Sequence, residues 1–174
     1  RHTGEIIVSD ADWNNGERIL VGSASGSHGT VQVDTGGTFT ATTALIGYDG
    51  TGTGVVTGAG SRWTLTDEVA DGDTGFFVGL RGTGNFSVLS GAKAVLAGNM
   101  FVGGAVAGTA GTGTVLLDGQ SSTGTSLHVP FVEVGATGTG ELTVKNNALL
   151  EVEGTLTVAA GAGAGGTLKI GAGG

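Results

Sequence analysis

The feature that most constrains the fold of this chain is a short apolar segment that ends in a small residue and recurs along the whole sequence. The six segments end at Gly22, Gly47, Gly79, Gly103, Gly135 and Ala159. Successive end positions are separated by 25, 32, 24, 32 and 24 residues. Spacing of this size is typical of repeat proteins in which each unit stacks on the next one.

Each unit contains two further short apolar segments. One alternates apolar and polar residues, as in 31–33, 86–88, 115–117 and 142–144, and the other includes Phe39, Trp63 and Leu149. Gly-Thr-Gly sequences at 52–54, 82–84 and 138–140 are expected to be corner turns, because glycine adopts positive φ without strain. The pattern predicts an all-β fold, a right-handed parallel β-helix (a three-sided β-solenoid) of about six rungs of 24–32 residues, with 1–174 as a single domain.

Composition excludes several other classes of protein. No window keeps helical apolar spacing, and glycine, with 38 residues, interrupts the chain too often for helices. The absence of cysteine excludes disulfides, Cys-ligated zinc and thiol chemistry. Only seven Lys and Arg residues and a net charge of −8 argue against nucleic acid and anionic membrane surfaces as partners. No apolar run is long enough for a membrane-spanning helix, so we expect no membrane insertion by this segment.

The repeats resemble a known family. A Val-Gly strand, a Gly-Thr-Gly sequence, a Leu-x-Val strand and a Gly-Ala-Gly-Ser-x-Trp segment, best seen in 55–63, 77–95 and 132–150, are similar to the glycine-rich passenger repeats of bacterial autotransporters of the AIDA and pertactin type. The resemblance implies a non-enzymatic virulence module, carried to the cell surface or secreted through the outer membrane of a Gram-negative bacterium. Its implied role is adhesion to a host-cell or matrix component, or self-association.

The same resemblance implies that the chain is a piece of a longer passenger, whose parent carries a C-terminal β-barrel translocator. Three other functions stay open. They are a secreted ligand for a host receptor, a structural stalk, and a polysaccharide-active β-helix enzyme.

One acidic cluster is the first candidate binding site. Asp67, Glu68, Asp71 and Asp73 lie within seven residues, in a segment that lengthens its unit to 32 residues. Carboxylates on a loop can bind Ca²⁺ or a basic partner, although the spacing does not match an EF-hand. A solvated acidic loop is the alternative, and we predict no other cofactor or metal.

Two tryptophans are the candidates for aromatic contacts. Trp13 and Trp63 occupy the same place in the repeat, where they either stand outward, ready to stack on sugars or a partner, or fill the core. The repeat-specific position favours the core. Phe76, Phe77, Phe86, Phe101 and Phe131 are likewise expected in core stacks.

A column of threonines is expected at one corner. Thr53, Thr83, Thr112 and Thr139 should align there. A flat threonine array would suggest ice binding, but a corner ladder of hydroxyl groups is the plainer interpretation.

Catalysis has little support in the sequence. Polysaccharide cleavage needs clustered carboxylates, and here they are spread singly, at Asp34, Asp49, Asp118, Glu133 and Glu141. Glu151 and Glu153 alternate on one strand and are expected to share a face. No histidine among His2, His28 and His128 lies in a nucleophile or metal motif.

Overall fold

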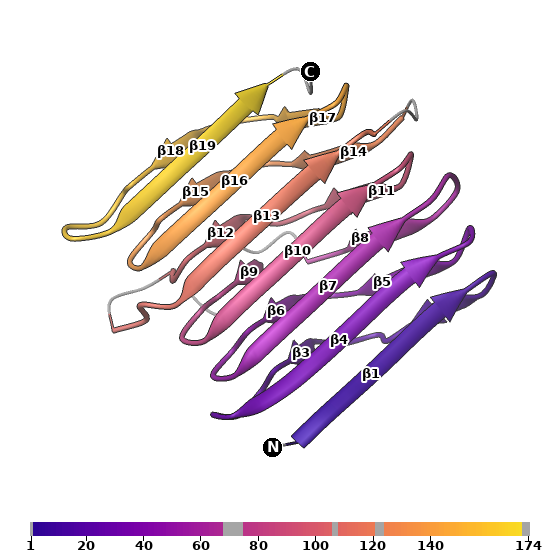
Figure 1. Cartoon of the computed structure of the whole chain (residues 1–174), viewed down its shortest axis with the longest axis horizontal. Coiled ribbons are helices and arrows are strands. Elements are labelled where there is room, and N and C mark those ends of the chain that lie inside the picture. The colour runs from indigo at the N-terminus through magenta and orange to yellow at the C-terminus, as the bar shows by residue number, and fades with distance from the viewer. Residues whose placement is uncertain (1, 68–74, 106–107, 121–123, 172–174) are drawn as a thin grey trace.

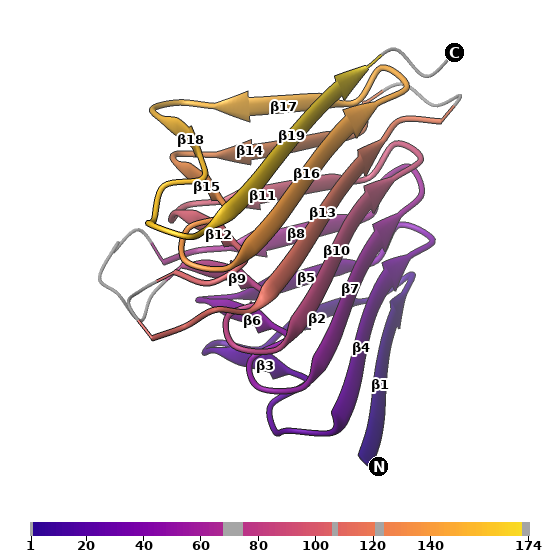
Figure 2. The ribbon, with the colours of Figure 1, turned by 60° about the vertical axis from the view of Figure 1, so that its left-hand side comes forward.

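The computed structural model describes residues 2–67, 75–105, 108–120 and 124–171, which form a parallel β-solenoid of about six turns (Figures 1 and 2). Every strand pairs in parallel with the equivalent strand one turn away, and this stacking builds three sheets. The described residues contain strands and no helix. The all-β, three-sided architecture that the repeat predicts is therefore confirmed.

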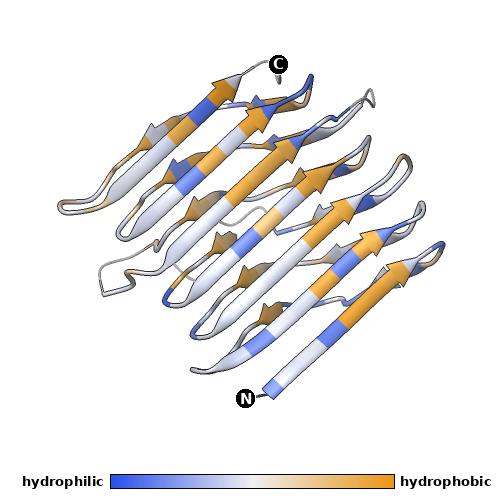
Figure 3. Cartoon of the chain, in the orientation of Figure 1, coloured by the Kyte–Doolittle hydropathy of each residue, from blue (hydrophilic) through white to orange (hydrophobic). Residues whose placement is uncertain are grey.

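Sheet A is the largest of the three and contains the longest strands. It consists of β1 (His2–Ser9), β4 (Ser27–Asp34), β7 (Thr51–Thr57), β10 (Thr83–Leu89), β13 (Thr112–Asp118), β16 (Thr139–Lys145) and β19 (Gly165–Gly171). The predicted Gly-Thr-Gly turns were wrong, because these residues lie in or lead directly into the strands of sheet A. In Figure 3 the first halves of these strands are mostly pale and the second halves are richer in orange, which marks hydrophobic residues.

Sheets B and C form the other two sides from shorter strands. Sheet B consists of β2 (Asp12–Asn14), β5 (Thr38–Ala41), β8 (Arg62–Leu65), β11 (Lys93–Leu96), β14 (Ser126–Val129) and β17 (Leu149–Val152). Sheet C consists of β3 (Ile19–Val21), β6 (Ala44–Ile46), β9 (Phe76–Val78), β12 (Met100–Val102), β15 (Val132–Val134) and β18 (Leu156–Val158). The three sheets follow one another along the chain in each turn, so the repeat in the sequence is the turn of the solenoid.

Alternation along each strand sends every second side chain into one core, which runs from Val8 to Val144. In β10, for example, Phe86 and Val88 are fully buried, whereas Ser87 between them is only half-buried. The predicted inward positions Val88 and Val134 are both fully buried. Apolar side chains from successive turns thus stack in columns, and these columns replace the single globular core of an ordinary domain.

Glycine closes the corner between sheet C and the next strand of sheet A. Gly79 directly follows β9 with φ of +73°, and a Cβ there would lie within 3.0 Å of three backbone atoms of Thr112 and Gly113. Gly84, in β10, faces the same corner from the other side, and a Cβ on it would collide with the backbone nitrogen of Gly79. Two columns of glycine therefore interlock, and the backbones pack directly against each other.

Candidate binding surface

The outer side of sheet A, here called the A face, carries mainly polar side chains in the first half of its strands. Two outward columns lie in the first half of the strands and are set by the strand register. The first column contains Thr3, His28, Thr51, Thr83, Thr112 and Thr139, and the second contains Glu5, Thr30, Thr53, Asn85, Thr114, Glu141 and Thr167. Neighbouring members are about 4.8 Å apart, the ordinary spacing of paired strands.

A column of threonines exists as predicted, but one of its members and its location in the solenoid differ from the prediction. Thr51, and not Thr53, is in register with Thr83, and the column continues through Thr112 and Thr139. It lies on the strands of a sheet and not at a corner. The error follows from assigning the Gly-Thr-Gly sequences to turns, which hid the first residue of each strand.

Two carboxylates of the A face, Asp34 and Glu141, are held by neighbouring side chains. Asp34 accepts hydrogen bonds from the Ser9 hydroxyl, from Gln32 Nε2 at 2.6 Å and from Thr35, and these bonds hold the pKa of Asp34 below its usual value. Glu141 pairs with Lys169 at 2.8 Å, which likewise lowers the pKa of Glu141. Asp34 is therefore satisfied by neutral hydrogen-bond donors, and Glu141 by an ion pair.

Asp118 is the most enclosed carboxylate of this region. Its Oδ1 accepts hydrogen bonds from Asn146 Nδ2 at 2.7 Å and from the backbone N–H of Gln120 at 2.9 Å, and its Oδ2 lies 3.2 Å from Lys145 Nζ. The Asn146 hydrogen bond is the largest cause that lowers the pKa of Asp118, followed by the Gln120 and Lys145 contacts. Asp118 closes the turn after β13 and is satisfied by it, which indicates a structural role.

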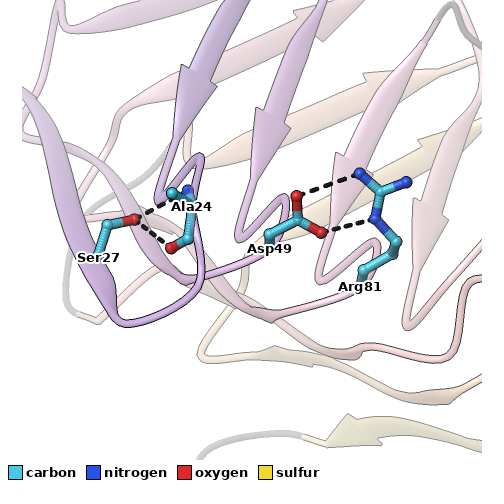
Figure 4. A network of polar contacts seen from close by, with 4 residues as sticks. All are labelled: Ala24, Ser27, Asp49 and Arg81. Carbon is cyan, nitrogen blue, oxygen red and sulfur yellow. Dashed lines mark hydrogen bonds and ion pairs between the residues drawn. The ribbon is translucent and has the colours of Figure 1, made fainter.

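Polar contacts also fix the corners below the A face (Figure 4). The Ser27 hydroxyl donates to the Ala24 carbonyl at 2.6 Å and accepts from the Ala24 N–H. In the next turns Arg81 forms a two-point ion pair with Asp49, at 2.6 and 3.2 Å, and lies over the Tyr48 ring at 4.2 Å. These contacts stiffen the corner, and they occupy Asp49, one of the candidate acids of the enzyme hypothesis.

The two tryptophans differ in exposure although they share one column. The Trp63 side chain is fully buried and packs 4.2 Å from Phe39 and 5.4 Å from Phe86 between ring centroids. Trp63 is therefore a core residue and not a surface contact, because its inward column position places it between the sheets. Trp13 is half-buried at the first turn, where its ring packs at a tilt against Phe39, with 4.9 Å between ring centroids.

A second apolar cluster lies on the outside of sheet C. Leu45, Phe77 and Leu80 are buried there, with Phe101 and Tyr48 packed against them. Phe77 and Phe101 are stacked at 5.3 Å, so these two rings do not join the inner core as the sequence predicted. They point outward because the neighbouring residues of each strand already supply the inward positions.

Glu133 continues this outward column. It is in register with Phe101, and burial raises its pKa above the usual value.

The acidic cluster lies almost entirely outside the described residues. Asp67 is described, and its backbone N–H donates to the Thr42 carbonyl at 3.2 Å. Glu68, Asp71 and Asp73 lie outside the described residues. The Ca²⁺ or basic-partner hypothesis for this segment stays a prediction.

Sheet B carries one group that sequence reasoning only half found. Glu151 and Glu153 share a face as expected, and His128 lies between them, with Nδ1 3.2 Å from Glu151 and Nε2 3.2 Å from Glu153. His128 and Glu151 are 23 residues apart, about one turn of the solenoid, which puts them in register on neighbouring strands. That spacing is the signal from which the contact could have been predicted. A groove beside this group is lined by Thr64, Thr66, Val95, His128, Pro130 and Glu153, together with Leu65, Leu96 and Ala97.

Both ring nitrogens of His128 face a carboxylate, so the imidazole bridges Glu151 and Glu153. Among the described residues, no group of three or more His, Asp or Glu side chains is arranged to hold a metal ion. Nor does any helix in the described part of the chain have the length and apolarity to cross a membrane.

Comparison of the chain with protein-family models, with curated proteins and with solved structures returned no match.

Proposed function

We propose that this chain is a non-enzymatic passenger module of the autotransporter kind, displayed on or secreted from a Gram-negative cell, that acts in adhesion or self-association through the A face. The observation that supports this most is the continuity of that face. Outward polar side chains, most of them Thr, recur over the seven strands, and a third outward column adds the apolar residues Ile7, Val55 and Leu116. Such a ladder offers many weak hydrogen bonds to a partner that is itself repetitive.

The size of the A face sets the strength of one contact. Seven strands at about 4.8 Å spacing and seven residues at about 3.3 Å rise give a face of roughly 29 by 23 Å. That area, about 650 Å², is below the ~800 Å² per partner of a standard protein interface. A single module therefore offers a contact at the small end of the standard range, and presenting many modules together strengthens attachment.

The composition of the face favours a protein or polysaccharide partner over ice. Thr51 with Thr53, and Thr112 with Thr114, form outward pairs on their strands. Asn85 and Glu141 interrupt the second column, and Glu141 brings an ion pair onto the face. A uniform hydroxyl array would be needed to order water over the whole surface, and this face is mixed.

The direct test presents many copies on one surface. Beads coated with the chain are scored for clumping and for attachment to cultured host cells. We expect at least one of these two responses. The double variant Thr53→Lys and Thr114→Lys puts two charges on the A face and should reduce binding severalfold, because an unpaired ammonium must be desolvated. The matched control is Thr40→Lys with Ser126→Lys, two half-buried positions on the outer side of sheet B.

The outcomes separate the remaining hypotheses. Loss of binding in the sheet B variant alone would contradict the A face as the contact surface. No clumping and no attachment by the unaltered chain would favour the stalk. Binding that disappears when residues 67–75 are replaced by a short Gly-Ser linker would favour the receptor ligand, and cleavage of a polysaccharide would favour the enzyme.

A further inference from the structure

The corner after each sheet C strand leaves no room for a side chain. At five turns this corner residue is glycine with positive φ, and a Cβ would lie within 3.0 Å of the backbone of a sheet A strand two turns further on. The five glycines and the residues they face are Gly22 with Thr51, Gly47 with Thr83, Gly79 with Thr112, Gly103 with Thr139, and Gly135 with Gly165. Each Cβ would point at the carbonyl group and at the following backbone nitrogen.

Ala159 occupies the sixth corner in the same conformation. Its φ is +58°, within the left-handed region that the five glycines use. Its N–H donates to the Val134 carbonyl at 2.8 Å, as the N–H of Gly135 donates to the Val102 carbonyl at 2.7 Å. The Ala159 Cβ therefore points where, at the five earlier corners, the backbone of a sheet A strand passes.

We propose that Ala159 blocks the addition of another strand, in the repeat register, to the outer edge of β19. Such a strand, whether from this chain or from a second copy, would bring its carbonyl group onto the Ala159 methyl group. Alanine is also strained in this left-handed conformation, which glycine adopts at the other five corners.

The methyl group of Ala159 would act at the outer edge of β19. Among the described strands, β19 is the last of sheet A, and it pairs only with β16. Ile170 is 75% exposed there, and Leu168 is half-buried. An unpaired apolar strand edge is a template for aggregation. With that edge blocked, copies of the chain meet through their lateral faces and not by continuing the solenoid end to end at β19.

The test offers β19 an additional turn and asks whether it docks. A second copy of residues 146–171 is inserted after Gly171, and the extended chain is made with Ala159 and with Ala159→Gly. The chain lacks cysteine, so Leu168→Cys in the original β19 supplies a single thiol that a docked strand would cover. Its labelling rate is measured in both extended chains and in the unextended Leu168→Cys chain.

The extended chain with Ala159 should label as fast as the unextended chain, and the Ala159→Gly extension should label at least about tenfold more slowly. A Leu142→Cys chain, with a buried thiol in β16, checks that the solenoid stays folded. Equal protection in both extended chains would overturn the proposal, since the methyl group would then block nothing. Equally fast labelling in both would also overturn it, because removing the methyl group would not open the edge.

Discussion

The interlocked glycine corners predict that one methyl group has very different costs at two glycines with the same backbone conformation. Gly79 and Gly26 have φ of +73° and +75°. A Cβ on Gly79 would collide with the backbone of Thr112 and Gly113, whereas a Cβ on Gly26 would meet nothing within 4 Å. Gly79→Ala and Gly26→Ala therefore share the conformational cost and differ only in the collision.

The magnitudes follow from these contacts. Left-handed alanine costs about 1–2 kcal/mol, partly offset by about 0.5–1 kcal/mol because alanine restricts the unfolded chain. Gly26→Ala should therefore lower the free energy of unfolding by about 1 kcal/mol. In Gly79→Ala the two turns must also separate, which strains the hydrogen bonds from Gly104 N–H to Gly79 O at 2.8 Å and from Thr112 N–H to Gly82 O at 2.9 Å. With about 1 kcal/mol for each bond and 1–3 kcal/mol for overpacking, the collision adds about 3–5 kcal/mol to the conformational cost of about 1 kcal/mol.

Thermal unfolding followed by circular dichroism, with urea titration of the same samples, measures both variants. For a chain of this size the melting temperature should fall by about 2–4 °C for Gly26→Ala and by about 10 °C for Gly79→Ala. Equal losses in the two variants would refute the direct packing of backbones at the corner. So would a Gly79→Ala chain as stable as the unaltered protein.

Three further predictions concern single side chains. Trp63→Ala should cost about 3–5 kcal/mol in urea unfolding, and Trp63→Phe less than about 2 kcal/mol, because phenylalanine also removes the buried Nε1–H that has no partner among the described residues; equal costs would contradict the buried indole. Because the pKa of Asp118 is lower in the folded chain than in the unfolded chain, its ionised carboxylate stabilises the fold at pH values above the ordinary pKa of Asp. That stabilisation is lost as the pH falls through the pKa of Asp118 in the folded chain. Melting temperatures from pH 7 to pH 2 should therefore fall less steeply for Asp118→Asn, and an unchanged slope would oppose this. Burial raises the pKa of Glu133, so its charge opposes folding near neutral pH; Glu133→Gln should raise stability by about 0.5 kcal/mol or less at pH 7, and a loss would count against the burial of its carboxylate.

Much of the fold could be predicted from the sequence because each turn of a solenoid repeats the same strand, corner and core positions. The corner positions from Gly22 to Ala159 all follow a sheet C strand, and all have positive φ. The inward residues of sheets A and B also follow from simple alternation. A signal repeated six times is easy to separate from local noise, even where single copies are weak.

The errors arose where local chemistry has two interpretations. Gly-Thr-Gly is common in turns, yet here Gly52 and Gly84 lie inside strands, because the corner glycines pack against them. The outward positions of Phe77 and Phe101 were missed because three-residue strands with apolar residues throughout carry no alternation that distinguishes the inner from the outer face.

The candidate site was less accessible than the fold. The A face depends on strand register, which brings residues about 25–30 positions apart side by side, as with Thr83 and Thr112. The contact of His128 with both glutamates likewise needs side-chain geometry that spacing alone does not supply.

If the A face is the surface that meets the partner, single cysteines on that face should be protected from labelling when the chain is bound. Thr114→Cys places a thiol on the A face and Thr40→Cys places one on the outer side of sheet B, in a chain that has no other cysteine. Labelling is compared between dispersed beads and beads that are clumped or attached to cells. We expect Thr114→Cys to label several times more slowly in the bound state while Thr40→Cys is unchanged. Protection of Thr40→Cys instead, or binding that leaves both thiols equally accessible, would contradict the account.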